Sequence, residues 1–328
     1  MHIKPTLSFS KNGTFRVLML SDTQEKVPFD QQSRIRLERL LDHARPDLVL
    51  LGGDNVMGPE IHSAEELEEV IDTLAQLLER RQLPWAHVFG NHDHDVKLLS
   101  EQEHQALYER YPHCVSGHTQ GIHGITNFTI PIYGHNSDQV VFQIWGLDTN
   151  NLVQGSEMDG LVASGDFRKE SVLPNMPVSS DVYEIVWFDQ LMWLWNTSME
   201  QERLRGRKTP GLLCMHRPPM EIHMLMDNQA QCGVTGGTEE AVSQPILNSG
   251  LFSMLLQRGE VQCICAGHTH MNTLHGTYCG VQLCFDGAAG CTCYGLESER
   301  GGRLFEISQE DPWNIQTRML RYCEIEGK

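Results

Sequence analysis

The chain has 328 residues, and 40% of them are hydrophobic, which is enough for the core of one large domain or two smaller ones. Its 25 basic and 43 acidic residues give a net charge of −18, so a polyanion such as duplex DNA would be repelled on average. No apolar run approaches the roughly 18 residues of a membrane span, and residues 1–5 lack the long apolar region of a secretory signal. The sequence therefore predicts a cytoplasmic protein without a membrane or nucleic-acid partner, and it leaves the oligomeric state open.

Three short apolar runs in the N-terminal half predict buried strands, and each run ends in a polar loop. The runs span 15–20, 47–51 and 85–89, and an amphipathic helix pattern follows each of them. Capping-box signatures open the second and third of these helices, at Ser63 and Ser100. Strand, polar loop and helix in repetition are typical of βαβ units, in which ligands gather outside the carboxyl ends of the strands.

The C-terminal half is more mixed, and we predict a single domain over 1–328. Strands are expected at 125–130, 140–145, 211–215 and 261–266, helices at 188–202 and 248–258, a loop at 224–240 and a β-hairpin at 273–286. In the first of these helices, Leu191, Met192 and Trp195 are expected to pack inward. Residues 151–182 show little periodicity and are predicted to form a surface insertion or lid.

Five polar segments follow predicted strands and carry most of the chemistry. They are Asp22-Thr23-Gln24, Gly53-Asp54-Asn55, Gly90-Asn91-His92-Asp93, His216 and Gly267-His268-Thr269-His270. Each segment alone is weak evidence, because Gly-Asp and His-x-His are common in turns and exposed strands. All five in this order, each at the end of a strand, predict one shared site.

The residue types in these segments fit a site for two divalent ions. Two ions about 3.5–4 Å apart can hold both the attacking and the leaving oxygen of a phosphoryl transfer. We expect Asp54 to bridge the ions, with Asp22, Gln24 and His270 completing the shell of the first ion and Asn91, His216 and His268 that of the second. A metal-bound hydroxide would then be the nucleophile.

His92 follows a predicted ligand and would lie close to the ions without binding them. There it can donate a proton to the leaving oxygen, and Asp93 is expected to orient it. Asn91, His92 and Arg217 are predicted to contact the substrate phosphate, although an ordinary salt bridge is an equal interpretation for Arg217.

Other polar residues receive a structural interpretation. His94, Asp95 and His123 are expected to lie on the surface, and Tyr294 is a further candidate to line the pocket. The ten cysteines include no Cys-x-x-Cys pair, and those in apolar runs are predicted to be free buried thiols. Cys291-Thr292-Cys293 remains a weak candidate for a redox or ligand pair.

These segments resemble the motifs of the calcineurin-like metallophosphoesterases, which are Asp-x-His, Gly-Asp, Gly-Asn-His-Asp/Glu, His and Gly-His-x-His. The runs Gly53 to Gly58, Met215 to Pro219 and Tyr294-Gly295 are similar to the branch of purple-acid-phosphatase-related and fungal Dcr2-type proteins. The resemblance covers roughly 14–308 and is weakest at 151–182. It implies an α/β fold, a four-layer α/β/β/α sandwich of two mixed sheets with a dinuclear site at the sheet edges.

Two residues depart from the family pattern. Val56-Met57-Gly58 offers no tyrosine where the purple enzymes bind ferric iron, so a ferric–tyrosinate site is not expected. Gln24 stands where the first motif has histidine, and an amide oxygen suits a hard cation better than zinc or iron. We therefore expect two divalent ions, Mn²⁺, Fe²⁺ or Zn²⁺, with a weakened first site.

Three functional hypotheses follow from these residues. The leading one is a metal-dependent phosphatase or small-substrate phosphodiesterase that acts on a phosphorylated small molecule or a phosphoprotein. A nuclease-like phosphodiesterase is the first alternative, against which the acidic charge argues. The second is a degenerate family member that binds one metal and serves as a scaffold or ligand-binding protein, for which Gln24 is the support.

Overall fold

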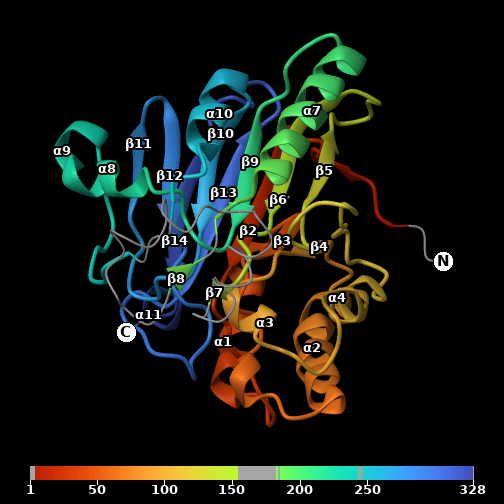
Figure 1. Ribbon diagram of the computed structural model, residues 1–328, viewed down its shortest axis with the longest axis vertical. Coiled ribbons are helices and arrows are strands. Elements are labelled where there is room, and N and C mark those ends of the chain that lie inside the picture. Colours follow the sequence, from red (N-terminus) through yellow and green to blue (C-terminus); the bar gives the residue numbers. More distant parts are fainter. Residues whose placement is uncertain (1–3, 154–181, 184, 243–244, 246, 328) are drawn as a thin grey trace, which may run out of the picture.

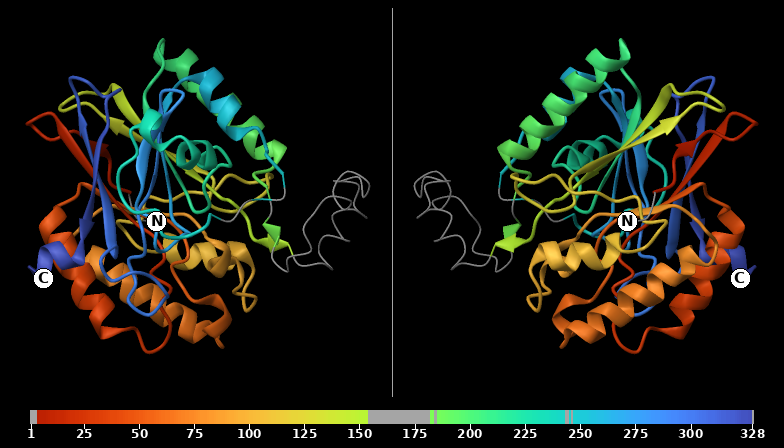
Figure 2. Two further views of the ribbon diagram at one scale, coloured as in Figure 1. Left: turned by 90° about the vertical axis from the view of Figure 1, so that its left-hand side faces the viewer. Right: turned by 90° about the vertical axis from the view of Figure 1, so that its right-hand side faces the viewer.

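The computed structural model describes residues 4–153, 182–183, 185–242, 245 and 247–327. Two β-sheets pack face to face and helices cover their outer faces, which gives four layers in the order α/β/β/α (Figures 1 and 2). This arrangement confirms the predicted fold class. Most of the predicted insertion at 151–182 lies outside the described residues, and at its ends β7 (Leu152–Val153) pairs with β8 (Val182–Tyr183).

The first sheet has five strands in the order β14-β13-β2-β3-β4. Their bounds are Thr14–Leu20 (β2), Leu48–Leu51 (β3), Trp85–His87 (β4), Gly301–Ser308 (β13) and Gln316–Arg321 (β14). Strands β2, β3 and β4 run parallel, whereas β13 is antiparallel to both β2 and β14. The carboxyl ends of the three parallel strands therefore meet at one edge of this sheet.

The second sheet has seven strands in the order β1-β5-β6-β9-β10-β12-β11. Their bounds are Leu7–Ser8 (β1), Phe128–Tyr133 (β5), Val140–Leu147 (β6), Gly211–Met215 (β9), Val261–Ala266 (β10), His275–Tyr278 (β11) and Val281–Phe285 (β12). Strands β6, β9, β10 and β12 are parallel to one another, so their carboxyl ends also share an edge.

Helices pack on the outer faces of the two sheets. Those beside the first sheet include α1 (Gln31–Ala44), α2 (Ala64–Glu79), α4 (Glu101–Glu109) and α11 (Tyr322–Glu326), and those beside the second are α7 (Phe188–Arg205), α8 (Ile222–Asp227), α9 (Gln229–Cys232) and α10 (Leu251–Arg258). Two short elements follow the ligand loops, η1 (Gly58–Glu60) and α3 (Asn91–His94). None of the described helices is both long and apolar enough to cross a membrane.

Three apolar clusters hold the layers together. The central cluster lies between the sheets and includes Val17 and Leu50 from the first and Ile144 and Leu212 from the second. The other two lie between each sheet and its helices. The apolar runs of the parallel strands are buried on both faces, as is usual for parallel sheets covered by helices. Figure 2 shows these layers edge-on.

Several sequence expectations are corrected by the structure. The strand expected at 125–130 begins at Phe128, and the expected loop at 224–240 contains part of α8 and all of α9. Met192 is 40% exposed, because the buried face of α7 is instead formed by Gln190, Leu191, Leu194 and Ser198. Strands β13 and β14 were not expected from the sequence, and the short alternating pattern of β14 is interrupted by charged residues.

Candidate metal centre

The loops after β2 and β3 lie side by side and place two aspartates at the edge of the first sheet. The backbone N–H of Asp22 donates to the carbonyl of Gly53 (3.0 Å), and that of Gln24 donates to the carbonyl of Asp54 (2.9 Å). Asp22, Gln24 and Asp54 all have left-handed backbone angles, with φ of 54°, 44° and 51°. These angles turn the chain sharply at the end of each strand, which keeps the three side chains close to the sheet edge.

The second sheet delivers the histidines to the same place. Strands β9 and β10 are neighbours, and the loops that follow them are joined by a hydrogen bond from the Gly267 N–H to the His216 carbonyl (3.0 Å). The backbone N–H of His268 donates to Oδ2 of Asp22 (2.9 Å). This bond links the ligand loops of the two sheets directly. Residues far apart in the sequence thus converge at one edge, as predicted from the strand order.

Asp54, His216 and His268 form a compact group of potential metal ligands. Their potential ligand atoms lie within 4.8 Å of one another. Nδ1 of His216 is 3.0 Å from the carbonyl of Gly52, and its Nε2 is 3.3 Å from Oδ2 of Asp54. A ring nitrogen held by a carbonyl fixes the tautomer and leaves the other nitrogen available to a metal.

Asn91 is the remaining predicted ligand of the second ion. It begins α3 and is buried, and its Oδ1 has no hydrogen-bond partner among the described residues. Buried amide oxygens are rarely left without a partner, because the desolvation cost is about 1–3 kcal/mol. An oxygen ligand for a cation is a physical reason for this exception, so the residues present fit a metal ion at the second site.

The turn at Gly90 cannot accommodate a side chain. A Cβ at this position would clash with Oδ1 of Asp54 and would lie 2.8 Å from Cδ2 of His216. The absence of a Cβ is therefore what allows the loop after β4 to approach the two ligands.

The first site contains Asp22, Gln24 and His270. Oδ1 of Asp22 lies 3.1 Å from Nε2 of His270, and Nε2 of Gln24 lies 3.1 Å from Oδ2 of Asp54 and 3.2 Å from Nε2 of His270. Asp54 thus contacts both groups through the same oxygen. Nε2 of Gln24 donates to Oδ2 of Asp54, and turning the amide over would present its oxygen, the atom that can bind a cation.

The pKa values of the site residues follow from burial and from neighbouring charges. The pKa of Asp54 is lowered, since burial, which raises it, is outweighed by His216. The pKa of His216 is raised to about 9, because burial, which lowers it, is outweighed by Asp54 and Asp22. The pKa of His268 falls well below its usual value through burial and the nearby His216 ring. Neutral His268 is therefore ready to act as a ligand, whereas His216 must lose a proton first.

His92 lies next to the ligands at the mouth of the site. Its backbone N–H donates to Oδ1 of Asp54 (2.8 Å), and its ring Nε2 lies 3.9 Å from Oδ2 of the same aspartate. Its side chain is 28% exposed, so a substrate can reach it. Nδ1 of His92 is 3.2 Å from Oδ2 of Asp95. Asp95 therefore orients His92, a role that the sequence analysis did not assign to it.

Asp93 was expected to orient His92, but it binds backbone groups of the neighbouring loops instead. Its buried carboxylate accepts hydrogen bonds from the N–H groups of Gly90, Asn55 and Val56, at 2.8 to 3.2 Å. It thereby joins the loops after β3 and β4. Asp93 is a positioning residue for these loops, and the described contacts of the His92 ring are instead with Asp95 and Asp54.

His94 is buried, contrary to the expectation of a surface position. Its Nε2 lies 2.9 Å from Oδ1 of Asp148, and its Nδ1 lies 2.6 Å from Oε1 of Glu101. Asp148 follows β6 directly and also accepts hydrogen bonds from the N–H groups of Ile125 and Thr126. Asp148 is a polar residue directly after a strand, which is the same signal that predicted the ligands, so the sequence offered a way to single it out. His123, in contrast, is exposed as expected.

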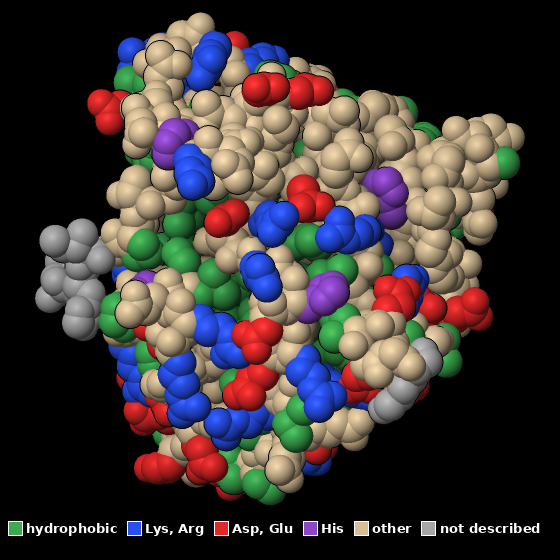
Figure 3. All heavy atoms as spheres, turned by 180° about the vertical axis from the view of Figure 1, so that it is seen from behind, with side chains coloured by type: hydrophobic (Ala, Val, Ile, Leu, Met, Phe, Trp, Pro, Cys, Tyr) green, Lys and Arg blue, Asp and Glu red, His purple; other side chains and the backbone are tan. Residues whose placement is uncertain are grey.

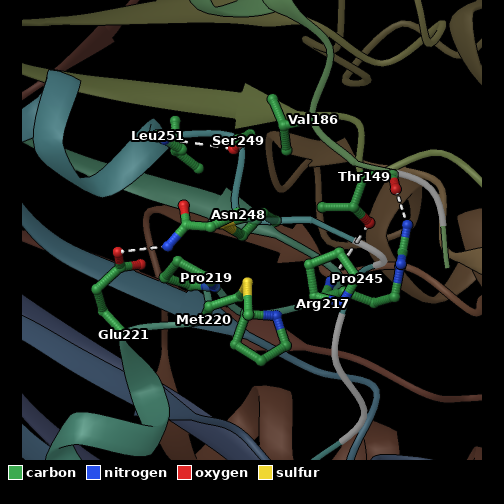
Figure 4. Close-up of a pocket in the computed structure, with 12 residues that line it drawn as sticks. Thr149, Val186, Arg217, Pro219, Met220, Glu221, Pro245, Asn248, Ser249 and Leu251 are labelled. Atoms are coloured by element: carbon green, nitrogen blue, oxygen red, sulfur yellow. Dashed lines mark hydrogen bonds between the residues drawn. The ribbon is translucent and has the colours of Figure 1, made fainter. Parts of the chain in front are cut away.

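Arg217 and Tyr294 flank the centre on two sides. The buried guanidinium of Arg217 donates through Nη2 to the carbonyl of Thr149, and both residues line a hollow next to the ligand loop of His216 (Figure 4). Tyr294 stacks on the His270 ring with centroids 3.9 Å apart, and its carbonyl is 2.8 Å from Nδ1 of His270. Tyr294 therefore orients His270.

Comparisons with known proteins identify the family of this chain. The family model described as calcineurin-like phosphoesterase matches residues 15–272. A probable inactive purple acid phosphatase 29 of Arabidopsis thaliana is 26% identical over 92% of this chain and 78% of its own length. Phosphatase DCR2 of Saccharomyces cerevisiae is 23% identical, and the match covers 95% of this chain and 54% of that protein.

One solved structure supports the fold. A dimetal phosphatase from Danio rerio superimposes with a TM-score of 0.54 at 14% sequence identity, covering 92% of this chain and 98% of the other. At this identity the similarity concerns the fold alone. The matched family model covers most of the sequence, and with the four-layer fold it shows that the chain belongs to the calcineurin-like phosphoesterase family.

Proposed function

We propose that this protein hydrolyses phosphate esters, either phosphomonoesters or small phosphodiesters, at a centre for two divalent ions. The observation that carries the proposal is the compact group of Asp54, His216 and His268, with the ring of His92 beside it. A buried ligand group with an accessible histidine at its rim is the arrangement that general acid catalysis next to a metal requires.

Each residue has a role in this proposal. Asn91, His216 and His268 would hold the second ion, Asp22, Gln24 and His270 the first, and Asp54 both. Bound ions would supply an activated water and would neutralise the phosphate charge. His92 donates a proton to the leaving oxygen, and Asp95 keeps its Nδ1 fixed so that Nε2 faces the site. Asn91 and His92 also contact the phosphate.

A small phosphorylated molecule or a phosphoprotein fits the surface better than a nucleic acid does. The net charge is −18, and on the face in Figure 3 acidic and basic side chains are interspersed in the lower half. A protein that binds duplex DNA needs clustered basic residues that neutralise several phosphates. The charge pattern therefore supports the phosphatase over the nuclease-like alternative.

A one-metal binding protein is the second candidate function. It is favoured by Gln24, whose amide stands where the family motif has an imidazole ligand and lies 3.1 Å from Oδ2 of Asp54. The Arabidopsis relative named above carries the description "probable inactive". In this case the second site would bind its ion, and the first would fill only at high metal concentration.

Turnover by metal-stripped protein separates the two candidates. The protein is titrated with Mn²⁺, and hydrolysis of p-nitrophenyl phosphate and of its bis-ester is measured for the wild type, His92→Ala and the exposed-site control His62→Ala. We expect metal-dependent turnover that is lost in His92→Ala and kept in the control. Binding of a single ion per chain with no turnover on either ester would instead establish the second candidate.

A further inference from the structure

We propose that a basic hollow, remote from the ligand loops, is a docking site for an acidic peptide segment of a partner protein. Its basic side chains belong to Arg205, which ends α7, and to Arg207 and Lys208, which lie in the turn before β9. Where the partner is also a substrate, the inference rests on the proposed function and narrows the substrate class to phosphoproteins with an acidic segment.

Two adjoining concave regions form the basic hollow. The first, of about 430 Å³, lies between the start of β6 and the end of α7. The second, of about 380 Å³, lies between the start of β9 and the loop that joins β13 to β14. Arg207 and Gln139 line both regions, so an extended chain that passes Arg207 can occupy both. Volumes of this size are typical of ligand sites.

The three cations of the basic hollow form no ion pair with a carboxylate of the described residues. Each donates instead to a neutral oxygen, which is Oε1 of Gln143 for Arg205 (2.9 Å), the carbonyl of Val140 for Arg207 (3.2 Å) and the carbonyl of Arg258 for Lys208. These bonds hold the side chains without neutralising them. In a chain with 43 acidic and 25 basic residues, three neighbouring cations without a carboxylate are an exception that an acidic ligand explains.

Two carboxylates also line the basic hollow. Asp138 belongs to the first region and Glu310 to the second, and both residues are exposed. Neither forms an ion pair within the part of the chain that the structure describes, so they leave the three cations uncompensated. Because these carboxylates repel other acidic groups, an acidic segment should bind around Arg207, which is common to the two regions.

Exposed apolar side chains favour a polypeptide as the ligand. Leu204 is 67% exposed and lines the first region, and Trp313 is 42% exposed and lines the second. Tryptophan and arginine are the residue types that contribute most to protein–protein binding. An extended peptide can offer carboxylates to the arginines and apolar side chains to Leu204 and Trp313.

A long polyanion fits the basic hollow less well. Duplex DNA is bound through about 6–10 phosphate contacts in strongly salt-dependent complexes, whereas the hollow offers three cations. The chain as a whole carries a charge of −18, so a rigid duplex would extend from the hollow over surface that repels it. A short flexible segment can instead be confined to the hollow.

The basic hollow lies at the opposite end of the second sheet from the metal centre. Strands β6 and β9 are parallel, and their carboxyl ends lead into Asp148 and His216. The hollow is lined by Val140 and Pro210, at the amino ends of the same strands. The five residues of β9, at about 3.3 Å each, separate the hollow from the ligand loop by about 16 Å. Substitutions in the hollow should therefore leave the hydrolysis of a small ester unchanged.

Peptide binding tests the docking site without relying on turnover. Fluorescence anisotropy of a short labelled peptide of glutamates with one central leucine gives the Kd for the wild type and for the double variant Arg205→Gln/Arg207→Gln. The control Arg45→Gln/Arg80→Gln removes the same charge from exposed arginines at the ends of α1 and α2. Circular dichroism checks that each variant is folded. We expect a Kd at least tenfold higher in the first variant, an unchanged Kd in the control, and weaker wild-type binding as salt is added.

Steady-state kinetics connect docking with substrate choice. For an acidic phosphoprotein such as casein, kcat/KM should fall at least fivefold in Arg205→Gln/Arg207→Gln and stay unchanged in the control. For p-nitrophenyl phosphate, kcat/KM should be the same in all three proteins. An equal loss on both substrates, or no loss on casein, would overturn the assignment of this surface to substrate docking.

The outcomes distinguish the docking site from the proposed function. Equal peptide affinity of the folded wild type and Arg205→Gln/Arg207→Gln would overturn the docking site, and so would tighter binding of a labelled oligouridylate of the same length at these arginines. Peptide binding that is lost in this variant alone, in a protein that hydrolyses neither casein nor the small esters, would support the docking site and overturn the proposed function.

Discussion

Oδ2 of Asp95 lies 3.2 Å from Nδ1 of His92, one turn of α3 away from the residue it orients. The pKa of His92 is raised, because burial, which lowers it, is outweighed by Asp95 and Asp54. The protonated form that donates to a leaving group is therefore favoured by this contact.

Asp95→Asn should lower kcat about tenfold with little change in KM, because the ring loses its orientation and part of its basicity. Without the raised pKa, the protonated form is lost at lower pH, so the alkaline limb of the kcat profile should move to lower pH. Steady-state kinetics from pH 5 to 9 measure this, with Asp227→Asn, an exposed aspartate, as the control. An unchanged pH profile would show that Asp95 does not act through His92.

Gly90→Ala should lower activity about 100-fold while leaving most of the fold intact. A Cβ at Gly90 would meet Oδ1 of Asp54, which must then move away from its partner ligands. A displacement of about 1 Å at such a site costs on the order of 100-fold in rate. Gly117→Ala is the matched control, since its Cβ would meet only ordinary contact with Phe128 at 3.5 Å. Equal activity of the two variants would contradict the prediction.

Metal binding at neutral pH should release protons. In the metal-free protein the pKa of His216 is raised to about 9 and that of His270 to about 11, because burial, which lowers both, is outweighed by Asp54 and Asp22 for His216 and by Asp22 for His270. Both rings must become neutral to bind a cation, so affinity should rise with pH. Calorimetry in two buffers of different ionisation enthalpy counts the protons. Binding without proton release would show that these rings are not ligands.

The raised pKa values of His216 and His270 also make the stability of the metal-free protein depend on pH. A raised pKa contributes stability that is fully present below the unfolded value of about 6.5 and is lost as the pH rises through the folded value. The melting temperature of metal-free protein should therefore fall from pH 7 to pH 10. Metal-loaded protein should not show this part of the decline, because the ions have replaced the protons. Thermal unfolding with and without Zn²⁺ makes the comparison.

Asp148→Asn should destabilise the fold strongly. Burial, which raises the pKa of Asp148 and lowers that of His94, is outweighed by their mutual attraction, so the former is lowered and the latter raised. Removing one partner of a buried ion pair costs about 3–5 kcal/mol in free energy of unfolding. Urea unfolding at pH 6 measures the loss, and Asp138→Asn, an exposed site, is the control.

The stability that the Asp148–His94 pair contributes depends on pH, and the sign of this dependence follows from the two pKa shifts. The contribution of Asp148 is present above its unfolded pKa of about 3.9 and is lost as the pH falls, while that of His94 is lost only as the pH rises well above about 6.5. The pair is therefore most stabilising between these limits. Wild-type stability should drop more steeply than that of Asp148→Asn on acidification below pH 4, and parallel curves would contradict the pairing.

Strand ends could be predicted from the sequence, whereas contacts between loops could not. The apolar runs before Asp22, Asp54 and Asn91 identified the parallel strands, and the strand order then placed the ligands together. Nothing in the sequence reports that Asp93 accepts from three backbone N–H groups or that Asp95 reaches His92. These contacts depend on the path of each loop after its strand, and periodicity carries no information about that path.

The burial of individual side chains was equally hard to predict. His94 has the polar neighbours of a surface residue, yet it is buried because Asp148 arrives from the other sheet with a compensating charge. Met192 looked like a core residue and is exposed, since the apolar positions of α7 occur on more than one face. Both cases depend on a partner that is distant in the sequence.

Left-handed backbone angles occur at four predicted ligands, Asp22, Gln24, Asp54 and His268. For a residue with a side chain this conformation costs about 1–2 kcal/mol, which glycine would avoid. A glycine at any of these positions would therefore relieve the backbone and at the same time remove a predicted ligand. Gln24 has the same kind of turn, with φ of 44°, although an amide stands where the family motif has histidine. Backbone strain at all four turns is thus tied to the side chains that these turns direct toward the site, as is common where strain supports function.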